Sequence, residues 1–313
     1  MFAVGIDVGG MSIKIGLVNQ NGEIIKKNSF KTDIDPYKSF CVAVQVIENL
    51  IKDANLTKSD ISGVGIGFPG IVDSKKREVC FLPNLPWDNF CVGEMLEEKL
   101  NLPVKISNDA NLATLAEVKF GSAKNYKSAV MFTLGTGVGG GVVIDGKLFE
   151  GWQSKGAELG HVTLVLDGER CGCGRKGCLE AYASATALIK QTKRKMLEDR
   201  TSIMWDYVGK NIDNVDGTTA FECMKKGDKS ATEVYHKYAE YLAHGIINML
   251  NVFRPEAFIL GGGISNHGKY LTDIIEKILE KYHYGITGAP KTKILIAELK
   301  NDAGIIGASA LFL

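Results

Sequence analysis

A strand, a glycine turn, a second strand and a hairpin follow one another twice in this chain, and this repeated order limits the fold more than any other feature. In the first copy, residues 2–8 alternate as a strand does, Gly9 and Gly10 interrupt the strand, and an Asn-Gly pair closes the following hairpin. In the second copy, residues 130–134 predict a strand, residues 135–141 a glycine loop, and an Asp-Gly pair another hairpin. Helical segments follow both copies. The pattern therefore predicts an α/β fold with duplicated domains.

The composition is that of an ordinary soluble globular protein. The 313 residues are enough for two domains, and 45% of them are apolar while 23% are charged. Because 37 basic residues nearly balance 36 acidic ones, we expect no nucleic-acid partner and no membrane-surface partner.

The sequence also favours a cytoplasmic location. Met1 leads directly into an apolar strand without a basic region or a cleavage site, so we expect no secretory signal. No apolar run reaches the roughly 18 residues that a transmembrane helix needs. The 7 cysteines are odd in number and partly clustered, which fits a reducing compartment better than a disulfide framework.

The remaining segments predict both strands and helices in the first part of the chain and mostly helices in the second part. Apolar periodicity favours helices near 39–53, 109–120, 183–198, 219–226, 230–253, 268–282 and 303–313, and strands near 63–68, 103–107, 258–260 and 293–297. No linker is rich in Pro, Gly or Ser. The domain boundary is therefore expected to be a compact hinge near residues 110–125.

One histidine and three cysteines lie close together in the middle of the chain. His161 is followed by Cys171, Cys173 and Cys178, with glycines between the cysteines that let the backbone curl. This ligand set suits a four-coordinate structural zinc ion, which builds a loop and leaves no position open for water. The alternatives are three unrelated buried thiols or a disulfide, and a cytosolic location disfavours the disulfide.

Three glycine turns at strand ends are candidates for holding phosphate groups. At the first, Asp7 stands beside Gly9 and Gly10, and Lys14 follows, so backbone amides can hold a phosphate while the acid meets its magnesium. An acid beside a Gly-Gly turn is also common in simple hairpins. The other two turns are Gly135-Thr136-Gly137 and Gly261-Gly262-Gly263. The first pair of glycines leads into a strand and no P-loop motif is present, so dinucleotide-binding and P-loop proteins are excluded.

Two asparagines and an aspartate are further candidates. Asn108 and Asp109 stand where a strand meets a helix, a position that projects side chains into a cleft in α/β proteins. Asp109 is also a favoured helix N-cap, so a structural role is the alternative. Asn84 lies in a loop with Trp87 nearby, which suits either a sugar face or a simple turn.

Together these motifs resemble those of the ROK family of sugar kinases, and within it the bacterial glucokinases, over nearly the whole chain. The cysteine pattern with its preceding E-x-G-H is highly specific, whereas the glycine turns are shared across the wider actin-like ATPase superfamily. The matching motifs are D-x-G-G at 7–10, N-D-A-N at 108–111, L-G-T-G-x-G-G at 134–140, E-x-G-H at 158–161, C-x-C-G-x-x-G-C-x-E at 171–180 and G-G-G at 261–263.

The resemblance implies a two-domain, actin-like ATPase (ribonuclease H-like) fold that closes on ATP and a hexose. It implies a small domain of residues 1–109 plus 301–313 and a large domain of residues 110–300 that carries the cysteine loop. The implied activity is ATP-dependent phosphorylation of a hexose, with glucose 6-phosphate as the expected product. We also expect a homo-oligomer, either a dimer or a tetramer.

The resemblance also implies a role for each candidate residue. Asp109 is implied as the general base, and Asp7 is implied to serve the Mg²⁺ and phosphate end of the site, with the three glycine turns contacting ATP. The residues implied to hold sugar hydroxyls are Asn84, Asn108, Asp109, Glu158, His161 and Glu180. The residues implied to bind Zn²⁺ are His161, Cys171, Cys173 and Cys178.

One residue departs from the family pattern. Met11 stands where the family usually has a threonine whose hydroxyl can meet the transferring phosphate. If this segment is already a strand, successive side chains point to opposite faces and Ser12 is turned away from the site that Met11 faces. A local bulge would restore the reach of Ser12, and the backbone amides of Gly9 and Gly10 are an alternative source of the contact. On this reasoning, Met11→Thr would raise turnover.

Several functions share these motifs. The alternatives are a kinase for another hexose, such as N-acetylmannosamine, fructose or allose, and a catalytically weak sugar sensor. The family also contains sugar-responsive repressors, which carry an N-terminal helix-turn-helix domain. This chain begins at the first strand, which favours an enzyme over a repressor.

Overall fold

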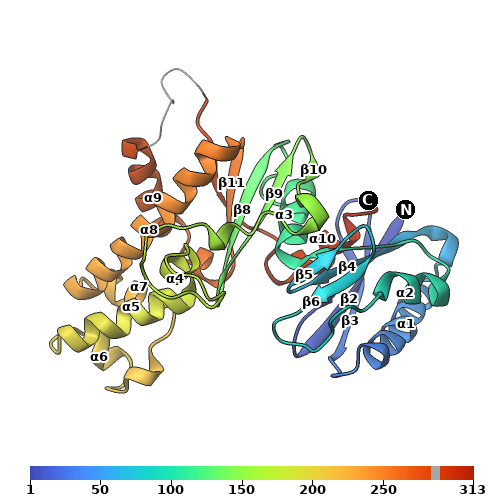
Figure 1. Ribbon diagram of the computed structural model, residues 1–313, viewed down its shortest axis with the longest axis horizontal. Coiled ribbons are helices and arrows are strands. Elements are labelled where there is room, and N and C mark those ends of the chain that lie inside the picture. The colour runs from blue at the N-terminus through green and yellow to red at the C-terminus, as the bar shows by residue number, and fades with distance from the viewer. Residues whose placement is uncertain (283–289) are drawn as a thin grey trace. The chain divides into compact units, whose positions relative to one another are not determined.

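The computed structural model describes residues 1–282 and 290–313, and Figure 1 shows their arrangement in two compact units. The first unit comprises Met1–Ala129, Gly141–Ala157 and Glu298–Leu313, and the second comprises Val130–Gly140 and Glu158–Ala297. This grouping by contacts keeps residues 110–129 with the first unit, whereas the expected boundary separates residues 109 and 110. It remains a prediction that two domains, divided between residues 109 and 110, close around a ligand. No helix in the described ranges is both long and apolar enough to cross a membrane.

The first unit is built on a five-stranded sheet in the order β3-β2-β1-β4-β7. The strands β1, β2 and β3 form antiparallel pairs, and β4 and β7 continue the sheet in parallel with β1. A short antiparallel pair, β5-β6, lies outside this sheet. The bounds are β1 Phe2–Val8, β2 Ser12–Asn19, β3 Ile24–Lys31, β4 Ile61–Phe68, β5 Ile71–Asp73, β6 Glu78–Phe81 and β7 Val104–Asn108. The helices of this unit are α1 Pro36–Asp53, α2 Val92–Leu100, α3 Asp109–Lys119 and α10 Ala303–Ser309.

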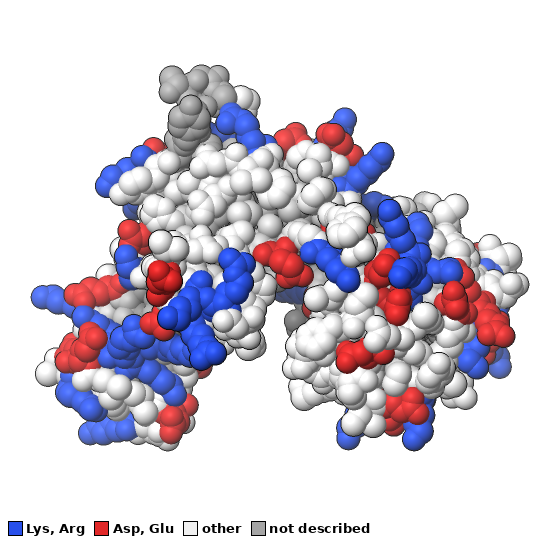
Figure 2. Space-filling model, viewed as in Figure 1, with Lys and Arg blue, Asp and Glu red and all other residues white. Residues whose placement is uncertain are grey.

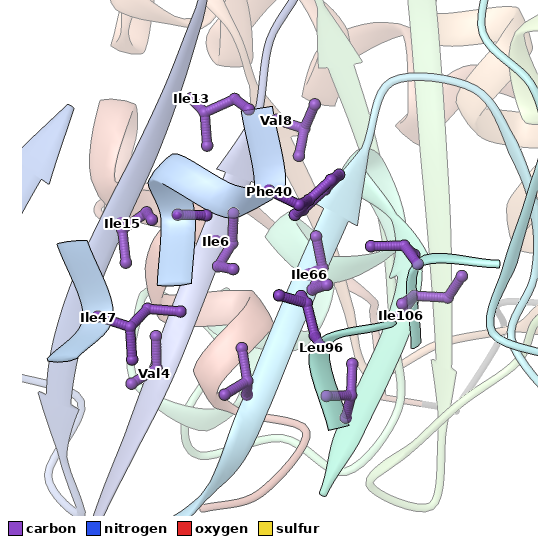
Figure 3. Close-up of a cluster of buried hydrophobic side chains, with 14 of the residues drawn as sticks. Val4, Ile6, Val8, Ile13, Ile15, Phe40, Ile47, Ile66, Leu96 and Ile106 are labelled. Carbon is purple, nitrogen blue, oxygen red and sulfur yellow. The ribbon is translucent and has the colours of Figure 1, made fainter. Parts of the chain in front are cut away.

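One face of the first sheet carries the apolar core. Val4, Ile6 and Val8 alternate along β1 and are buried together with Phe40 and Ile47 of α1, as Figure 3 shows. The period of two along the strand explains why the intervening residues face the other side of the sheet.

The opposite face accepts the C-terminal helix α10 at very short range. A Cβ atom added at Gly5 or at Gly65 would overlap the main-chain carbonyl of Ile305 or Ala308, so the backbone of α10 rests directly on β1 and β4. A Cβ atom at Gly63 would instead meet the ring of Phe312, near the end of the chain. Glycine is therefore required wherever the two backbones approach one another.

The second sheet repeats the order of the first. Its strands follow β10-β9-β8-β11-β12, which is the same arrangement of third, second, first, fourth and fifth strand as in the first sheet. The bounds are β8 Ala129–Leu134, β9 Val138–Ile144, β10 Lys147–Leu148, β11 Ala257–Gly261 and β12 Lys293–Ile296. This repetition confirms the duplicated α/β architecture predicted from the two glycine-turn copies.

Helices make up most of the rest of the second unit. They are α4 Glu180–Ala183, α5 Ala185–Glu198, α6 Met204–Tyr207, α7 Thr219–Lys225, α8 Lys229–Phe253 and α9 Lys269–Tyr282. The helix expected over 183–198 is interrupted at Ser184, whose extended backbone ends α4 and whose side chain caps α5 by accepting from the amide of Ala187. The helices α2 and α6 and the pair β5-β6 were not predicted from the sequence.

The close approach of α10 leads to a prediction for stability. We expect Gly65→Ala to lower the free energy of unfolding by about 3 kcal/mol, because the added methyl meets the helix backbone and overpacking costs roughly 1–3 kcal/mol. Gly63→Ala, two residues away on the same strand, should cost only about 1 kcal/mol because the Phe312 ring can move aside. Urea denaturation measures both values. Equal losses in the two variants would show that backbone contact with α10 is not the limiting constraint.

Candidate catalytic and ligand-binding residues in the two units

In the first unit, Asp7 is held at the end of β1. The Nζ atom of Lys14, which lies directly opposite in β2, is 3.1 Å from Oδ2 of Asp7. A Cβ atom at Gly304 of α10 would lie 2.6 Å from Cγ of Asp7, so the carboxylate rests against the C-terminal helix. The side chain that the sequence links to magnesium is therefore fixed from two sides.

In the glycine turn beside Asp7, the carbonyls of Gly9 and Met11 accept hydrogen bonds and two amides are available. The amide of Gly9 donates to the carbonyl of Ser12 at 3.0 Å. Thr32 donates its hydroxyl to the carbonyl of Gly9 at 2.7 Å and its amide to the carbonyl of Met11 at 3.1 Å. Among the described residues, no group accepts a hydrogen bond from the amide of Gly10 or of Met11. Successive unpaired amides of this kind form a concavity for anions.

The structure corrects the expected orientation of Ser12. It is the first residue of β2 and stands two residues before Lys14, so both side chains lie on the face of the sheet that carries Asp7. The two also line one cavity of about 450 Å³ together with Asp302. Met11 precedes the strand, and 87% of its side chain is exposed. The expectation that Ser12 is turned away was wrong because it assumed that Met11 already belongs to the strand, whereas Met11 precedes β2 and Ser12 shares the face of Lys14 and Asp7.

Asn108 and Asp109 have different structural roles from those considered in the sequence. Asn108 is the N-cap of α3, and its Oδ1 accepts from the amides of Ala110 and Asn111 at 2.9 and 3.2 Å. Its Nδ2 donates to the carbonyl of Gly70 at 3.1 Å. Asp109 is the first residue of the helix, and its Oδ1 accepts from the amide of Ala110. Asn108 therefore performs the capping that Asp109 was considered for.

Asn84 lies against the glycine turn of the same unit. A Cβ atom at Gly10 would be 3.4 Å from Cβ of Asn84, which is in ordinary van der Waals range. The loop around Asn84 is anchored by Trp87, which is almost fully buried and donates its indole N–H to the carbonyl of Ile34 at 2.9 Å. The structure thus brings Asn84, the glycine turn and Asp7 together at one edge of the first sheet.

The glycine loop between β8 and β9 in the second unit also has bonded carbonyls and two amides without an acceptor among the described residues. The carbonyl of Gly135 accepts from the amide of Ala185 at 2.9 Å, and the carbonyl of Thr136 accepts from the hydroxyl of Thr186 at 2.8 Å. The amides of Thr136 and Gly137 have no acceptor within residues 1–282 and 290–313. A Cβ atom at Gly135 would meet nothing within 4 Å, so open space lies in front of this loop.

Glu180, the first residue of α4, connects the glycine loop to the cysteine loop. Its Oε2 accepts from the amide of Val138 at 3.0 Å, and its Oε1 lies 3.3 Å from Sγ of Cys171. A Cβ atom at Gly137 would overlap the Glu180 carboxylate, so any larger residue there would have to displace this side chain. Two sequence motifs that lie far apart along the chain therefore share one carboxylate.

The four predicted zinc ligands gather in one cluster. The ligand atoms of His161, Cys171, Cys173 and Cys178 all lie within 4.8 Å of one another. Sγ of Cys173 and Sγ of Cys178 are 3.7 Å apart, as are Sγ of Cys171 and Nδ1 of His161. A tetrahedral zinc ion with Zn–S bonds of about 2.3 Å requires ligand separations of about 3.8 Å. The donor set and its spacing fit zinc, with Nδ1 of His161 facing the cluster and Nε2 left for a second partner.

The three thiols of the cluster differ in acidity. Burial raises the pKa of Cys171 to about 12 and also raises the pKa of Cys178. A hydrogen bond from the amide of Arg175 lowers the pKa of Cys173. Because zinc binds thiolates, a metal ion must displace these protons, so metal affinity should increase with pH.

Glu158 follows a strained stretch of backbone. Ala157 has φ of 61°, a left-handed conformation that non-glycine residues rarely adopt. The exposed Glu158 is followed by a 3-10 turn, η3 (Leu159–His161), in which the amide of His161 donates to the carbonyl of Glu158 at 3.1 Å. This turn joins the residue predicted to bind sugar to the first ligand of the cysteine cluster.

The third glycine turn ends β11. Gly262 has φ of 82°, which requires glycine, and its carbonyl accepts from both the amide and the hydroxyl of Ser265 at 3.1 and 2.7 Å. A Cβ atom at Gly263 would meet nothing within 4 Å. The 3-10 turn that follows, η5 (Gly263–His267), ends at a histidine that sequence reasoning did not select.

That histidine anchors η5 to the helices of the second unit. Nδ1 of His267 is 2.8 Å from the hydroxyl of Tyr235 in α8, and its ring stacks on Phe221 of α7 with centroids 4.1 Å apart. Burial lowers the pKa of His267 to about 4. The nearby charges oppose one another, since Glu222 raises the pKa and Lys225 lowers it. No local sequence signal could have identified His267, because its partners come from distant helices.

A larger cavity in the second unit contains none of the predicted site residues. It has a volume of about 730 Å³ and lies where Figure 2 shows Lys and Arg gathered over the helical part of this unit. Five cations and three carboxylates line it, and Arg194–Glu169 and Lys195–Glu233 form ion pairs there. This cavity therefore does not present a field of one sign.

Comparison with known proteins identifies the family. The sequence model of the ROK family matches residues 3–313. The chain belongs to the ROK family. A glucokinase of Streptomyces coelicolor is 34% identical over 310 residues, which cover 98% of this chain and 96% of that protein. A xylose repressor of Caldicellulosiruptor bescii is 33% identical over 313 residues, which cover 98% of this chain and 77% of that protein.

A solved ROK structure agrees over the full length. The crystal structure of a ROK family glucokinase from Streptomyces griseus in complex with glucose and AMPPNP superposes with a TM-score of 0.81 at 31% identity, and the match covers 100% of this chain and 99% of that one. The family and the two-domain actin-like ATPase fold predicted from the sequence are thereby confirmed.

The burial of His267 leads to a prediction for pH dependence. Its pKa of about 4 lies below the ordinary value of 6.5, so the fold favours the neutral ring. The associated stability is complete above pH 6.5 and is lost as the pH falls towards 4, because the unfolded chain binds a proton first. At about 1.4 kcal/mol per pH unit, this difference amounts to about 3 kcal/mol.

We therefore expect the free energy of unfolding to fall more steeply between pH 6.5 and 4 in the native protein than in His267→Gln. Urea denaturation at a series of pH values measures this difference. His236→Gln, which removes an exposed histidine from the same helix as Tyr235, is the control and should keep the native slope. Identical slopes in all three proteins would mean that His267 is not held neutral by burial.

Proposed function

We propose that the protein is an ATP-dependent hexose kinase with glucose as its substrate. The observation that carries this proposal is the pair of glycine turns, one after β1 and one after β8, in which carbonyls are held by internal hydrogen bonds while successive amides are left for an anion. Full-length similarity to glucokinases supports the hexose as phosphate acceptor. ATP is supported as the donor by the nucleotide analogue in the related crystal structure.

Phosphoryl transfer to a sugar requires few chemical groups. A hydroxyl is a poor nucleophile until a carboxylate accepts its proton, and the remaining catalysis is positioning and neutralisation of charge. We propose that Asp109 is this base, which its position at the start of α3 supports because Asn108 already caps the helix. The amides of Gly10 and Gly137 are proposed donors to the phosphates. Mg²⁺ would be held near Asp7 and would neutralise phosphate charge.

The proposed sugar contacts are the residues that the family resemblance implies. Glu158, Glu180 and Nε2 of His161 can each bond hydroxyls, and a site built of such groups discriminates against sugars that leave them unpaired. Asn84 is exposed and available for this role. Asn108 has only its second Nδ2 hydrogen to offer, because its other polar positions are engaged in the helix cap and with Gly70.

We further propose that the cysteine cluster binds a structural zinc ion through His161, Cys171, Cys173 and Cys178. Zinc on Nδ1 of His161 would fix the ring plane and the tautomer, so that Nε2 carries the proton offered to a sugar hydroxyl. The metal thus serves sugar recognition through its effect on the loop and not through chemistry.

Two other properties belong to this proposal. We propose a homo-oligomer, a dimer or a tetramer, which light scattering coupled to size-exclusion chromatography can test. We propose a cytoplasmic location, which cell fractionation can test. The alternatives are a kinase for another hexose and a weakly active sugar sensor. An ADP-release assay with ATP across a panel of hexoses separates these functions, and no ADP above background with any sugar would remove the kinase proposal.

For the general base, we expect Asp109→Asn to keep hexose affinity within a few fold and to lower kcat by about 100-fold or more. The helix should remain intact because Asn108 supplies the cap. Asp145→Asn, in the exposed hairpin turn, is the matched control and should have native kcat. Steady-state kinetics and calorimetry measure both quantities. Near-native turnover in Asp109→Asn would assign Asp109 a structural role only.

For zinc, we expect about one ion per chain by elemental analysis. Cys173→Ser should lose most of the zinc and weaken hexose binding, because His161 is then no longer oriented by the metal. Cys41→Ser, an exposed cysteine outside the cluster, should keep both properties. Native hexose affinity in metal-free protein would disconnect the zinc from sugar recognition.

For the departure at Met11, the structure changes the expected result. A hydrogen bond to a charged group is worth roughly 1.5–3 kcal/mol, which corresponds to about 10- to 100-fold in rate. Because Ser12 lies on the face of Asp7, we expect Ser12→Ala to lower kcat by about 10-fold or more. Met11→Thr should stay within a few fold of native. A large gain in Met11→Thr, with no effect of Ser12→Ala, would restore the original interpretation.

A further inference from the structure

Two of the three glycine turns, those after β1 and after β8, are each tied to a neighbouring element by one threonine hydroxyl. In the first unit, Oγ1 of Thr32 donates to the carbonyl of Gly9 at 2.7 Å. In the second unit, Oγ1 of Thr186 donates to the carbonyl of Thr136 at 2.8 Å. The two units share neither the connecting element nor the spacing along the sequence, yet they use the same chemical group for the same bond.

Each threonine hydroxyl binds the carbonyl of one peptide group. The N–H of that same peptide group has no acceptor among the described residues. The C=O of Gly9 and the N–H of Gly10 are in one trans peptide group, as are the C=O of Thr136 and the N–H of Gly137. In a planar trans peptide, the C=O and the N–H point in opposite directions. A hydroxyl that binds the carbonyl from one side therefore directs the N–H to the other side.

Both threonines are themselves held in place. Thr32 is buried, and the segment that follows it is anchored where Ser39 accepts from the amide of Asp33 and Trp87 donates to the carbonyl of Ile34. Thr186 stands in the first turn of α5, next to Ala185, whose amide donates to the preceding carbonyl of the same loop. Each hydroxyl is thus presented from a fixed backbone.

We propose that Thr32 and Thr186 are positioning residues that orient the amides of Gly10 and Gly137 towards the phosphates of the bound nucleotide. Glycine peptides rotate at little steric cost, so an untied turn populates orientations in which the amide points away from the ligand. Only the correctly oriented fraction binds, and the apparent dissociation constant increases as that fraction falls. This inference rests on the proposed function for the identity of the nucleotide.

The test compares variants that lose the threonine hydroxyl with variants that keep a hydroxyl at the same position. Thr32→Val and Thr186→Val keep the size of the side chain and lose the donor, whereas Thr32→Ser and Thr186→Ser keep the donor. We expect each valine variant to weaken AMPPNP binding by about 5- to 10-fold, the effect of one lost neutral hydrogen bond. The serine variants should stay within about 2-fold of native, and hexose affinity should be unchanged in all four. Titration calorimetry measures each affinity.

A second measurement separates orientation from general damage. In ¹⁵N-labelled protein, AMPPNP should shift the amide resonances of Gly10 and Gly137 in the native chain. Thr32→Val should reduce the shift of Gly10 alone, and Thr186→Val that of Gly137 alone. Native AMPPNP affinity in both valine variants, or failure of serine to restore it, would overturn the inference.

These measurements distinguish failure of the proposed kinase function from failure of the inference about Thr32 and Thr186. If the native protein binds AMPPNP but phosphorylates no hexose, the kinase proposal is wrong while the effect of the threonines on AMPPNP binding still decides this inference. If the native protein does not bind AMPPNP at all and its Gly10 and Gly137 resonances do not move, both are overturned.

Discussion

The rest of the first unit depends on direct contact between two backbones. Glycines in β1 and β4 let α10 lie on the sheet with its carbonyls where Cβ atoms would otherwise stand. The same contact places Gly304 against Asp7, so the last helix of the chain supports a carboxylate at the end of the first strand. The 18 residues of α1 cover the other face with ordinary side-chain packing, which tolerates substitution better than backbone contact does.

In the second unit, the structure depends in a similar way on one carboxylate, that of Glu180, which contacts two separate loops. Glu180 accepts from the amide that follows the glycine loop and lies beside the first cysteine of the cluster. A movement of either loop must displace this carboxylate or break its bond to Val138. The arrangement therefore connects the proposed nucleotide loop with the proposed sugar and zinc loop through one short side chain, without a long chain of intermediates.

The sequence predicted what local spacing determines. The strand and turn pattern predicted both sheets, and the interval between His161 and the cysteines predicted their cluster, because ligands close in sequence have few ways to assemble. Local spacing did not show that β2 begins at Ser12, so the expected alternation between Met11 and Ser12 did not apply. Thr32 and Thr186 were missed for another reason, since their partners lie 23 and 50 residues away.

The two glycine turns show how a fold without a P-loop can hold phosphate. A P-loop places its amides at the start of a helix, where the dipole of the helix adds to them. Here each turn leads from one strand into the next, so its amides do not stand at the start of a helix that the turn itself opens. The orientation of the peptide groups must then come from bonds to their carbonyls. These bonds come from Thr32, the residue after β3, in one unit and from the start of α5 in the other, which is why glycine alone does not specify such a turn.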